Sequence, residues 1–131
     1  MIFLDTSAIY AILDVKEELH DHAFSLLKEA LENGEEFVTH NYVLSESAAL
    51  IHRRLGAKEA LAFLKTPGSM TIIWIDNLLH AEAVHELEIM PSSKISFVDA
   101  ASFVVMRECH IDTYLGFDKH FSDMGFKQYN S

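Results

Sequence analysis

Cysteine, proline and glycine are all scarce in this chain of 131 residues, which contains one, two and five of them respectively. The single Cys109 excludes an internal disulfide framework and a zinc cluster built from thiolates, and it is compatible with a reducing cytosol. Half of the residues are hydrophobic. That content, with so few turn-forming residues, argues against disorder and against a β-sandwich with many turns. The composition favours helices packed around a buried sheet.

Long hydrophobic runs are also lacking. A membrane-spanning helix needs about 20 consecutive apolar residues, and the longest apolar runs fall far short of that length. The first apolar residues have no basic flank of the kind that begins a secretory signal peptide. We therefore expect a soluble, cytoplasmic protein. The length is typical of one domain and no repeat or linker divides the chain, so residues 1–131 are expected to form a single domain.

Positive charge is scarce as well. The chain contains ten Lys and Arg residues and 20 Asp and Glu residues, which gives a formal net charge of -10. A protein that binds phosphates by charge alone should be basic, so this balance argues against a nucleic-acid partner without excluding one. Divalent ions held by carboxylates would neutralise part of the negative charge around them. An acidic surface would also complement a basic partner protein.

Hydrophobic spacing and turn signals predict strands that alternate with helices. The expected strands are residues 2–4, 37–39, 71–75, 112–115 and 127–129. The expected helices are residues 6–13, about 19–32, 40–55, 57–64, about 77–90 and 96–109. This alternation implies a mostly parallel sheet covered on both faces, with right-handed crossovers. Ligands bind to such sheets beyond the carboxyl ends of the strands.

Two side chains are assigned to the core, and the histidine pairs to the surface. Trp74 belongs to a strongly β-prone run and is expected to pack in the sheet core. Cys109 ends a helix that is nearly apolar all round, so we expect a small buried thiol. The paired histidines lack the i, i+4 spacing of a helical zinc site. They are His20 with His22 and His80 with His85.

Four carboxylates interrupt otherwise apolar stretches at or near the end of a predicted strand or the start of a helix: Asp5, Glu46, Asp99 and Asp118. An unpaired buried carboxylate costs several kcal/mol or takes up a proton. Such groups therefore pair, bind a metal or reach the surface.

Each carboxylate also has a simple local explanation. Asp5 can cap the N-terminus of the helix that follows it, and Asp118 can begin a turn. Asp99 forms a capping-box pattern with Ser96. Glu46 can be a solvated helix residue, although it lies on or beside the apolar stripe of its helix. Only the conjunction of the four indicates one acidic metal site.

Clustered carboxylates suit magnesium or manganese. These ions take oxygen ligands, and magnesium prefers octahedral geometry and keeps waters that a phosphate can displace. One or two such ions can activate a water and stabilise the oxyanions of an in-line displacement at phosphorus. Without metal, the carboxylates would raise one another's pKa values, so metal binding should stabilise the fold.

The segments around the four acids resemble those of the PIN domain, in particular its small VapC-like ribonucleases. The matching segments are Phe3-Leu4-Asp5-Thr6-Ser7-Ala8, Tyr42-Val43-Leu44-Ser45-Glu46, Ser96-Phe97-Val98-Asp99-Ala100 and Phe117-Asp118-Lys119-His120-Phe121. Their order and spacing cover nearly the whole chain. The resemblance implies a metal-dependent endoribonuclease that uses Mg²⁺ or Mn²⁺. It also implies a three-layer α/β/α sandwich whose central, mostly parallel sheet has the strand order 3-2-1-4-5.

The resemblance also assigns roles to the acids. Asp5 and Asp99 match the principal metal ligands of the family. Glu46 and Asp118 match the second pair, which completes the site directly or through water. Asp123 is a further candidate acid near the site.

Small hydroxyl residues match the supporting positions of the family. Thr6 or Ser7 would orient the first aspartate or a bound water, and Ser96 would support Asp99. Gly116-Phe117 departs from the pattern, because many relatives have a small hydroxyl residue just before the last aspartate. That departure leaves the arrangement around Asp118 open.

The family further implies partners. Many members are toxins that an antitoxin silences by filling the active-site groove, and many form homodimers. RNA would be the substrate, but the motifs do not encode which RNA. The candidate cations for contact with its phosphates are Arg53, Arg54, Lys94 and Lys119.

Three other readings remain open at this point. A phosphatase of the haloacid dehalogenase kind would need a second Asp two residues after Asp5, where this chain has Ser7. A receiver-type signalling domain would need a phosphoacceptor after its third strand, for which Asp76 is the candidate. A PIN domain can also keep its acids and act mainly as a protein- or RNA-binding component of a larger complex.

Overall fold

The computed structural model describes residues 1–65, 68–90 and 93–130, and within them five short strands form one parallel sheet. The strands are β1 (Ile2–Leu4), β2 (Phe37–His40), β3 (Thr71–Ile73), β4 (Thr113–Leu115) and β5 (Lys127–Gln128). Their order is β3-β2-β1-β4-β5, and each neighbouring pair is parallel. The predicted sheet order 3-2-1-4-5 is confirmed.

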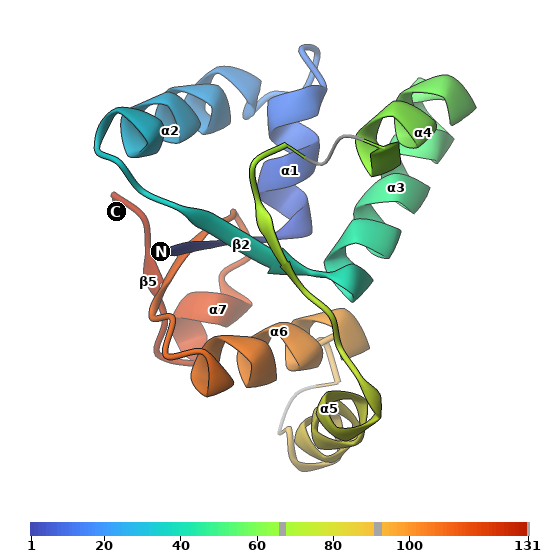
Figure 1. The fold of residues 1–131 in the computed structure, drawn as a ribbon, viewed down its shortest axis with the longest axis vertical. Coiled ribbons are helices and arrows are strands. Elements are labelled where there is room, and N and C mark those ends of the chain that lie inside the picture. Colours follow the sequence, from blue (N-terminus) through green and yellow to red (C-terminus); the bar gives the residue numbers. More distant parts are fainter. Residues whose placement is uncertain (66–67, 91–92, 131) are drawn as a thin grey trace.

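Seven helices cover this sheet in the described part of the chain. They are α1 (Thr6–Leu13), α2 (His20–Glu32), α3 (Asn41–Leu55), α4 (Ala57–Lys65), α5 (Asn77–Ile89), α6 (Phe97–Glu108) and α7 (His120–Asp123). In Figure 1, α1 to α4 lie above the strands and α5, α6 and α7 lie below them. The arrangement is the expected three-layer α/β/α sandwich. None of the described helices is long and apolar enough to span a bilayer.

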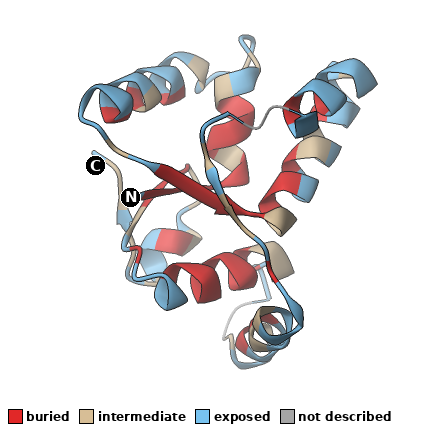
Figure 2. Cartoon of the chain, viewed as in Figure 1, coloured by how far each residue is buried: buried red, intermediate tan, exposed pale blue. Residues whose placement is uncertain are grey.

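The core follows the central strands and the helices beside them, as the buried segments of Figure 2 show. Every residue of β1 is buried, because this strand is central in the sheet and has helices on both faces. The predicted buried helix is confirmed: α6 is buried without interruption from Asp99 to Met106. A carboxylate at the start of this run therefore lies at the end of the core.

The prediction that Trp74 packs in the core is wrong. The strand β3 ends at Ile73, and the Trp74 side chain is 70% exposed. The reason is position, since β3 is an edge strand and its own residues are exposed or half-buried. High β-propensity indicates a strand but does not distinguish an edge from the centre.

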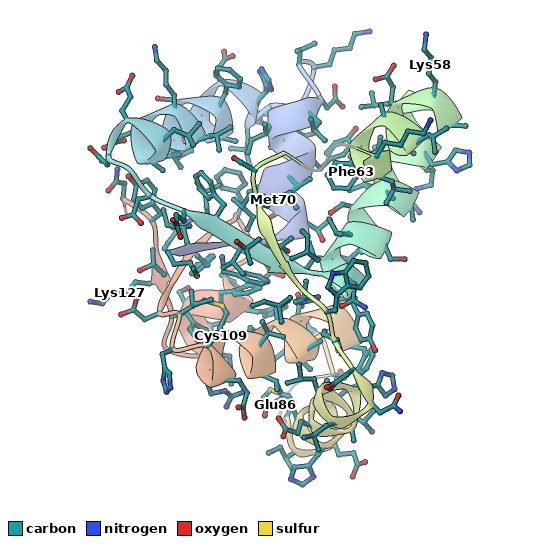
Figure 3. All side chains as sticks on the ribbon, in the orientation of Figure 1. Lys58, Phe63, Met70, Glu86, Cys109 and Lys127 are labelled. Atoms are coloured by element: carbon teal, nitrogen blue, oxygen red, sulfur yellow. The ribbon has the colours of Figure 1, made fainter. Side chains whose placement is uncertain are left out.

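The prediction of a buried thiol at Cys109 is also wrong, because this residue is exposed. Cys109 is the C-cap residue of α6, where the helix leaves the core, and Figure 3 shows it at that end. The short helix α7 was not predicted. It lies between β4 and β5 and follows directly on Asp118 and Lys119.

Candidate active site

Asp5 follows β1 and occupies the N-cap position of α1, where its side chain is 4% exposed. The carboxylate makes no capping hydrogen bond. Instead, its Oδ2 accepts a hydrogen bond of 3.0 Å from the Ser7 hydroxyl. Ser7 Oγ in turn accepts the Phe117 N–H at 2.9 Å, which joins the turn after β1 to the loop after β4. Ser7 therefore fixes one oxygen of the Asp5 carboxylate.

Burial is the largest cause that raises the pKa of Asp5 to about 7. The negative charge of Asp99 is the second cause, and that of Asp118 adds to it, while the Ser7 hydrogen bond acts in the opposite direction. A buried carboxylate that is also repelled by two others holds its proton unless a cation offsets the charge.

Gly116 leaves room for this arrangement. A Cβ atom at this position would lie 3.0 Å from Asp5 Cβ and 3.3 Å from Ser7 Oγ. Both separations are shorter than ordinary van der Waals contact, so a larger residue would push Asp5 or Ser7 out of place. Gly116 thus allows Asp5 and Ser7 to approach the loop after β4 closely.

Asp99 combines two roles in the structure. Its backbone N–H donates to Ser96 Oγ at 3.1 Å, and its Oδ2 accepts the Ser96 N–H at 3.4 Å, which together form a capping box at the start of α6. The predicted capping box is confirmed. Burial first, and then the charge of Asp118, raise the pKa of Asp99. The cap therefore fixes a carboxylate that also faces another acid.

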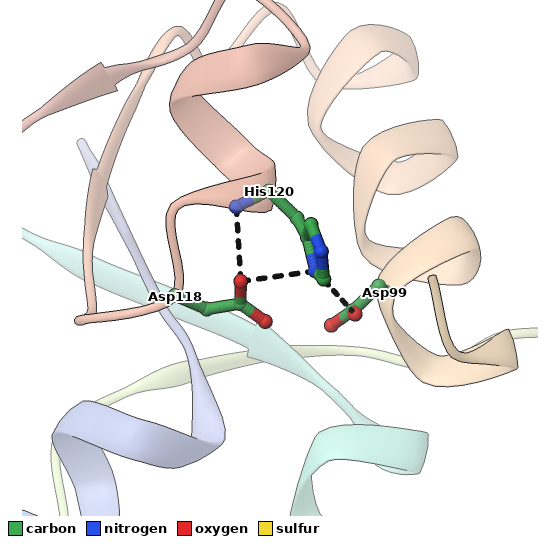
Figure 4. Close-up of side chains that lie close together, drawn as sticks. All are labelled: Asp99, Asp118 and His120. Carbon is green, nitrogen blue, oxygen red and sulfur yellow. Dashed lines mark hydrogen bonds and ion pairs between the residues drawn. The ribbon is translucent and has the colours of Figure 1, made fainter. Parts of the chain in front are cut away.

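Asp118 meets Asp99 across an imidazole that the four-acid pattern did not include. Asp118 Oδ1 accepts the His120 N–H at 2.9 Å and lies 3.0 Å from His120 Nδ1. The same Nδ1 lies 3.7 Å from Asp99 Oδ2, as Figure 4 shows. Nδ1 is buried and has no partner in hydrogen-bonding geometry within the described chain. A histidine two residues after the last acid was the available signal.

Glu46 lies at the rim of the site. It is exposed on α3, although its charge is close enough to contribute to the raised pKa of Asp99. It lines an open pocket of about 340 Å³ together with Tyr42 and Phe97. The sequence placed Glu46 on or beside the apolar stripe, and the structure places it beside the stripe, toward solvent.

Two further predicted residues are less closely tied to the acids. Thr6 is buried, and its Oγ1 has no hydrogen-bond partner within the described residues. Asp123 is exposed on α7. Among the described residues, the compact group of donors that could share one ion consists of Asp99, Asp118 and His120, so it does not include Asp123 or two of the four predicted ligands, Asp5 and Glu46.

His40 forms a second buried network beside the site that the sequence did not reveal. Its Nδ1 caps α3 by accepting the N–H groups of Tyr42 and Val43, both at 3.2 Å. Its Nε2 lies 2.8 Å from Ser102 Oγ, which donates to the Val98 carbonyl at 2.8 Å. Burial lowers the pKa of His40 to about 3, so the ring is neutral and Nε2–H donates to Ser102. The network holds α3 against α6.

The donor set fits a divalent cation. The ligand atoms of Asp99, Asp118 and His120 all lie within 4.8 Å of one another. In an octahedron with bonds of about 2.1 Å, adjacent ligands are about 3.0 Å apart and opposite ligands about 4.2 Å. The separation of 3.0 Å between His120 Nδ1 and Asp118 Oδ1 matches adjacent ligands, and that of 3.7 Å between Nδ1 and Asp99 Oδ2 lies between the two values. Carboxylate oxygens suit such an ion, and a transition metal also accepts an imidazole nitrogen.

Arg54, one of the cations predicted to contact phosphate, already interacts with two other residues. Arg54 lies over the Tyr10 ring, 5.0 Å from its centroid, and pairs with Glu17 at 3.9 Å. Lys119 is exposed in the loop between Asp118 and α7. Of these two, Lys119 is next to an acid of the site.

The family profile for the PIN domain matches residues 2–127. The chain belongs to the PIN domain family. This assignment replaces the phosphatase and receiver readings. The 23S rRNA-specific endonuclease VapC20, from two strains of Mycobacterium tuberculosis, is 33% identical to this chain over 129 residues. The match covers 96% of this PIN domain chain and 95% of the relative.

The fold of this PIN domain is also that of a solved structure. The crystal structure of VapC20 from Mycobacterium tuberculosis, described as a sarcin-ricin loop cleaving toxin, superposes with a TM-score of 0.84. Sequence identity is 30%, and 96% of each chain is covered. Identity and coverage of this size indicate a relative with the same arrangement of elements from end to end.

Proposed function

We propose that this PIN domain is a metal-dependent endoribonuclease and the toxin of a toxin–antitoxin pair. The observation that carries the proposal is the convergence of its acids: the charges of Asp99 and Asp118 raise the pKa of Asp5, and that of Glu46 raises the pKa of Asp99. Acids gathered from the ends of β1 and β4 and from the starts of α3 and α6 destabilise one another unless a cation binds. Such an arrangement favours the binding of a metal ion and lowers the stability of the metal-free fold.

Each residue has a part in the proposed reaction. Asp99 and Asp118 would hold the cation with Asp5 beside them, while Glu46 would contact it from the rim, directly or through water. Ser7 and Ser96 fix the orientation of Asp5 and Asp99. One or two Mg²⁺ or Mn²⁺ ions, when bound, supply Lewis-acid stabilisation and lower the pKa of a water. Water adds to phosphorus and the 3′-oxygen leaves, which by family analogy yields a 5′-phosphate.

Ribosomal RNA is the first substrate to consider. VapC20 carries the name of a 23S rRNA-specific endonuclease. A net charge of -10 opposes tight binding to RNA in general. It is consistent with an enzyme that selects a structured loop by its shape and its unstacked bases.

The proposed partners follow from the same reasoning. An antitoxin with a basic segment would complement the acidic site and compete with the metal for it. A homodimer would bring two such sites into one particle. Both partners remain proposals for this chain.

The experiment that tests the proposed function is cleavage of 23S rRNA and of a mixed structured RNA pool by purified protein. Lanes contain Mn²⁺, Mg²⁺ or EDTA, with wild type and with Asp99→Asn. Cleavage that needs both the metal and Asp99 supports the nuclease. Equal cleavage by Asp99→Asn would indicate a contaminating enzyme. RNA binding without cleavage in any lane would favour a binding module.

A further inference from the structure

His120 places a ring nitrogen between two carboxylates of the proposed metal site. Its Nδ1 lies 3.0 Å from Asp118 Oδ1 and 3.7 Å from Asp99 Oδ2. The atom is buried although the side chain as a whole is 21% exposed, and its close contact with Asp118 does not have hydrogen-bonding geometry within the described parts of the chain. The ligand atoms of Asp99, Asp118 and His120 lie close enough together to share one ion.

The fold fixes the backbone of His120 on both sides. On one side, the His120 N–H donates to Asp118 Oδ1 at 2.9 Å, so the acid fixes the backbone of the histidine. On the other side, the next residue, Phe121, is fully buried. Its ring stacks on Tyr114 at a centroid distance of 4.9 Å and meets Phe103 edge-on at 5.1 Å. The backbone position of His120 is therefore set by the core, and from it the ring reaches Asp99 and Asp118.

We propose, on the basis of the metal-dependent nuclease proposed above, that His120 Nδ1 is a direct ligand of the bound cation. The nitrogen ligand then determines which ion the site prefers. Mg²⁺ takes oxygen ligands, whereas Mn²⁺, although it also favours carboxylates, is a transition metal and accepts one imidazole nitrogen more readily. We therefore expect the site to bind Mn²⁺ more tightly than Mg²⁺, with His120 as the residue responsible for the difference.

A rival explanation is that His120 is a positively charged counter-ion for Asp99 and Asp118. The two explanations predict opposite effects on metal affinity. A counter-ion competes with the metal for the carboxylates, so its removal would tighten metal binding. A ligand contributes to binding, so its removal weakens it.

The first experiment measures Mn²⁺ and Mg²⁺ binding by calorimetry for wild type, His120→Asn and His52→Asn. His52 is an exposed histidine on α3 and serves as the matched control. We expect His120→Asn to weaken Mn²⁺ binding by about tenfold or more, with little change for Mg²⁺ and none for His52→Asn. Equal or tighter Mn²⁺ binding by His120→Asn would overturn the proposal.

The second experiment needs only the wild-type chain, so it stands even if His120→Asn fails to fold. Electron spin echo spectra of bound Mn²⁺ are recorded with ordinary protein and with protein carrying ¹⁵N-histidine. Nitrogen modulation that changes with the isotope supports the ligand. Bound Mn²⁺ without such modulation defeats this inference and leaves the nuclease proposal standing, whereas wild-type protein that neither binds Mn²⁺ nor cleaves RNA defeats both.

Discussion

His40 Nε2 and Ser102 Oγ, 2.8 Å apart, join the end of β2 to the middle of α6 inside the protein. The same ring caps α3 through Nδ1, so one neutral histidine connects the helix that carries Glu46 with the helix that carries Asp99. Its low pKa keeps the ring neutral, and because Nδ1 accepts two N–H groups the single proton lies on Nε2, which makes Ser102 Oγ its acceptor. The relative position of two acids of the site thus depends on a contact between residues that are not acidic.

Ser102→Ala should lower the free energy of unfolding by about 1–3 kcal/mol, because the buried Nε2–H of His40 would lose its acceptor. Urea denaturation of the metal-free protein measures this loss. Ser122→Ala is the matched control, since Ser122 Oγ also donates to a nearby helix carbonyl, that of Lys119 at 2.9 Å, but on an exposed residue. If both variants lose the same stability, the His40 network contributes nothing beyond a local hydrogen bond.

Asp5→Asn should stabilise the metal-free protein at neutral pH. The pKa of Asp5 is raised from 3.8 to about 7, so the folded state binds the proton more tightly than the unfolded state. The stability from the protonated carboxyl is complete below pH 3.8 and is lost as pH rises to about 7. That loss is roughly 4 kcal/mol at most, and Asn avoids it. Melting temperatures in EDTA across pH 4 to 8 measure the effect.

His40 adds a second pH dependence to the free energy of unfolding, with the opposite sign. Its pKa falls from 6.5 to about 3, so it contributes stability that is present above pH 6.5 and is lost as pH falls toward 3. Wild type combines these opposing trends, with Asp99, whose pKa is also raised, adding to that of Asp5, and it should have a shallow profile between pH 4 and 6.5. Asp5→Asn removes one trend, so its stability should fall distinctly on acidification. A variant profile parallel to that of wild type would contradict the assignment of the raised pKa to Asp5.

Much of the fold could be predicted from the sequence because its signals are local. The apolar run of β1, the capping box of Ser96 and Asp99, and the apolar face of α6 depend on residues close together in the chain. The exposure of Trp74 could not be predicted in this way. It depends on which strand lies at the edge, and the order of strands is a property of the whole sheet.

In the candidate site, too, the features that could be predicted differ from those that depend on the whole fold. The acids at the ends of β1 and β4 could be predicted to converge, because the carboxyl ends of parallel strands share one edge of the sheet. The ring of His120 could not be placed, because its contact with Asp99 requires α7 to pack against α6 through Phe121. Glu46 shows a limit of helical spacing, which predicts the side of the helix on which a residue lies but not whether its side chain is exposed.

Gly116→Ala should damage the site more than the fold. The added Cβ would lie 3.0 Å from Asp5 Cβ, so Asp5 or the backbone must shift, at a cost of about 1–3 kcal/mol. Because Ser7 and Asp5 share this contact, metal affinity and RNA cleavage should fall together. Gly34→Ala is the control, since its backbone φ of +74° disfavours alanine but no atom lies within 4 Å of the new Cβ. That variant should lose stability and keep its metal affinity.

Removal of the metal should destabilise wild type and barely affect a variant whose acids no longer repel one another. Saturation at 100 times the dissociation constant adds about 2.7 kcal/mol to the free energy of unfolding. Asp99→Asn/Asp118→Asn loses two ligands and also relieves the repulsion that raises the pKa of Asp5. We therefore expect the double variant to be more stable than wild type in EDTA, to gain little from Mn²⁺, and to be less stable than wild type when Mn²⁺ is saturating.

Asp21→Asn, an exposed change on α2, should follow wild type in both conditions. A double variant that Mn²⁺ still stabilises as strongly as wild type would show that the ion binds elsewhere.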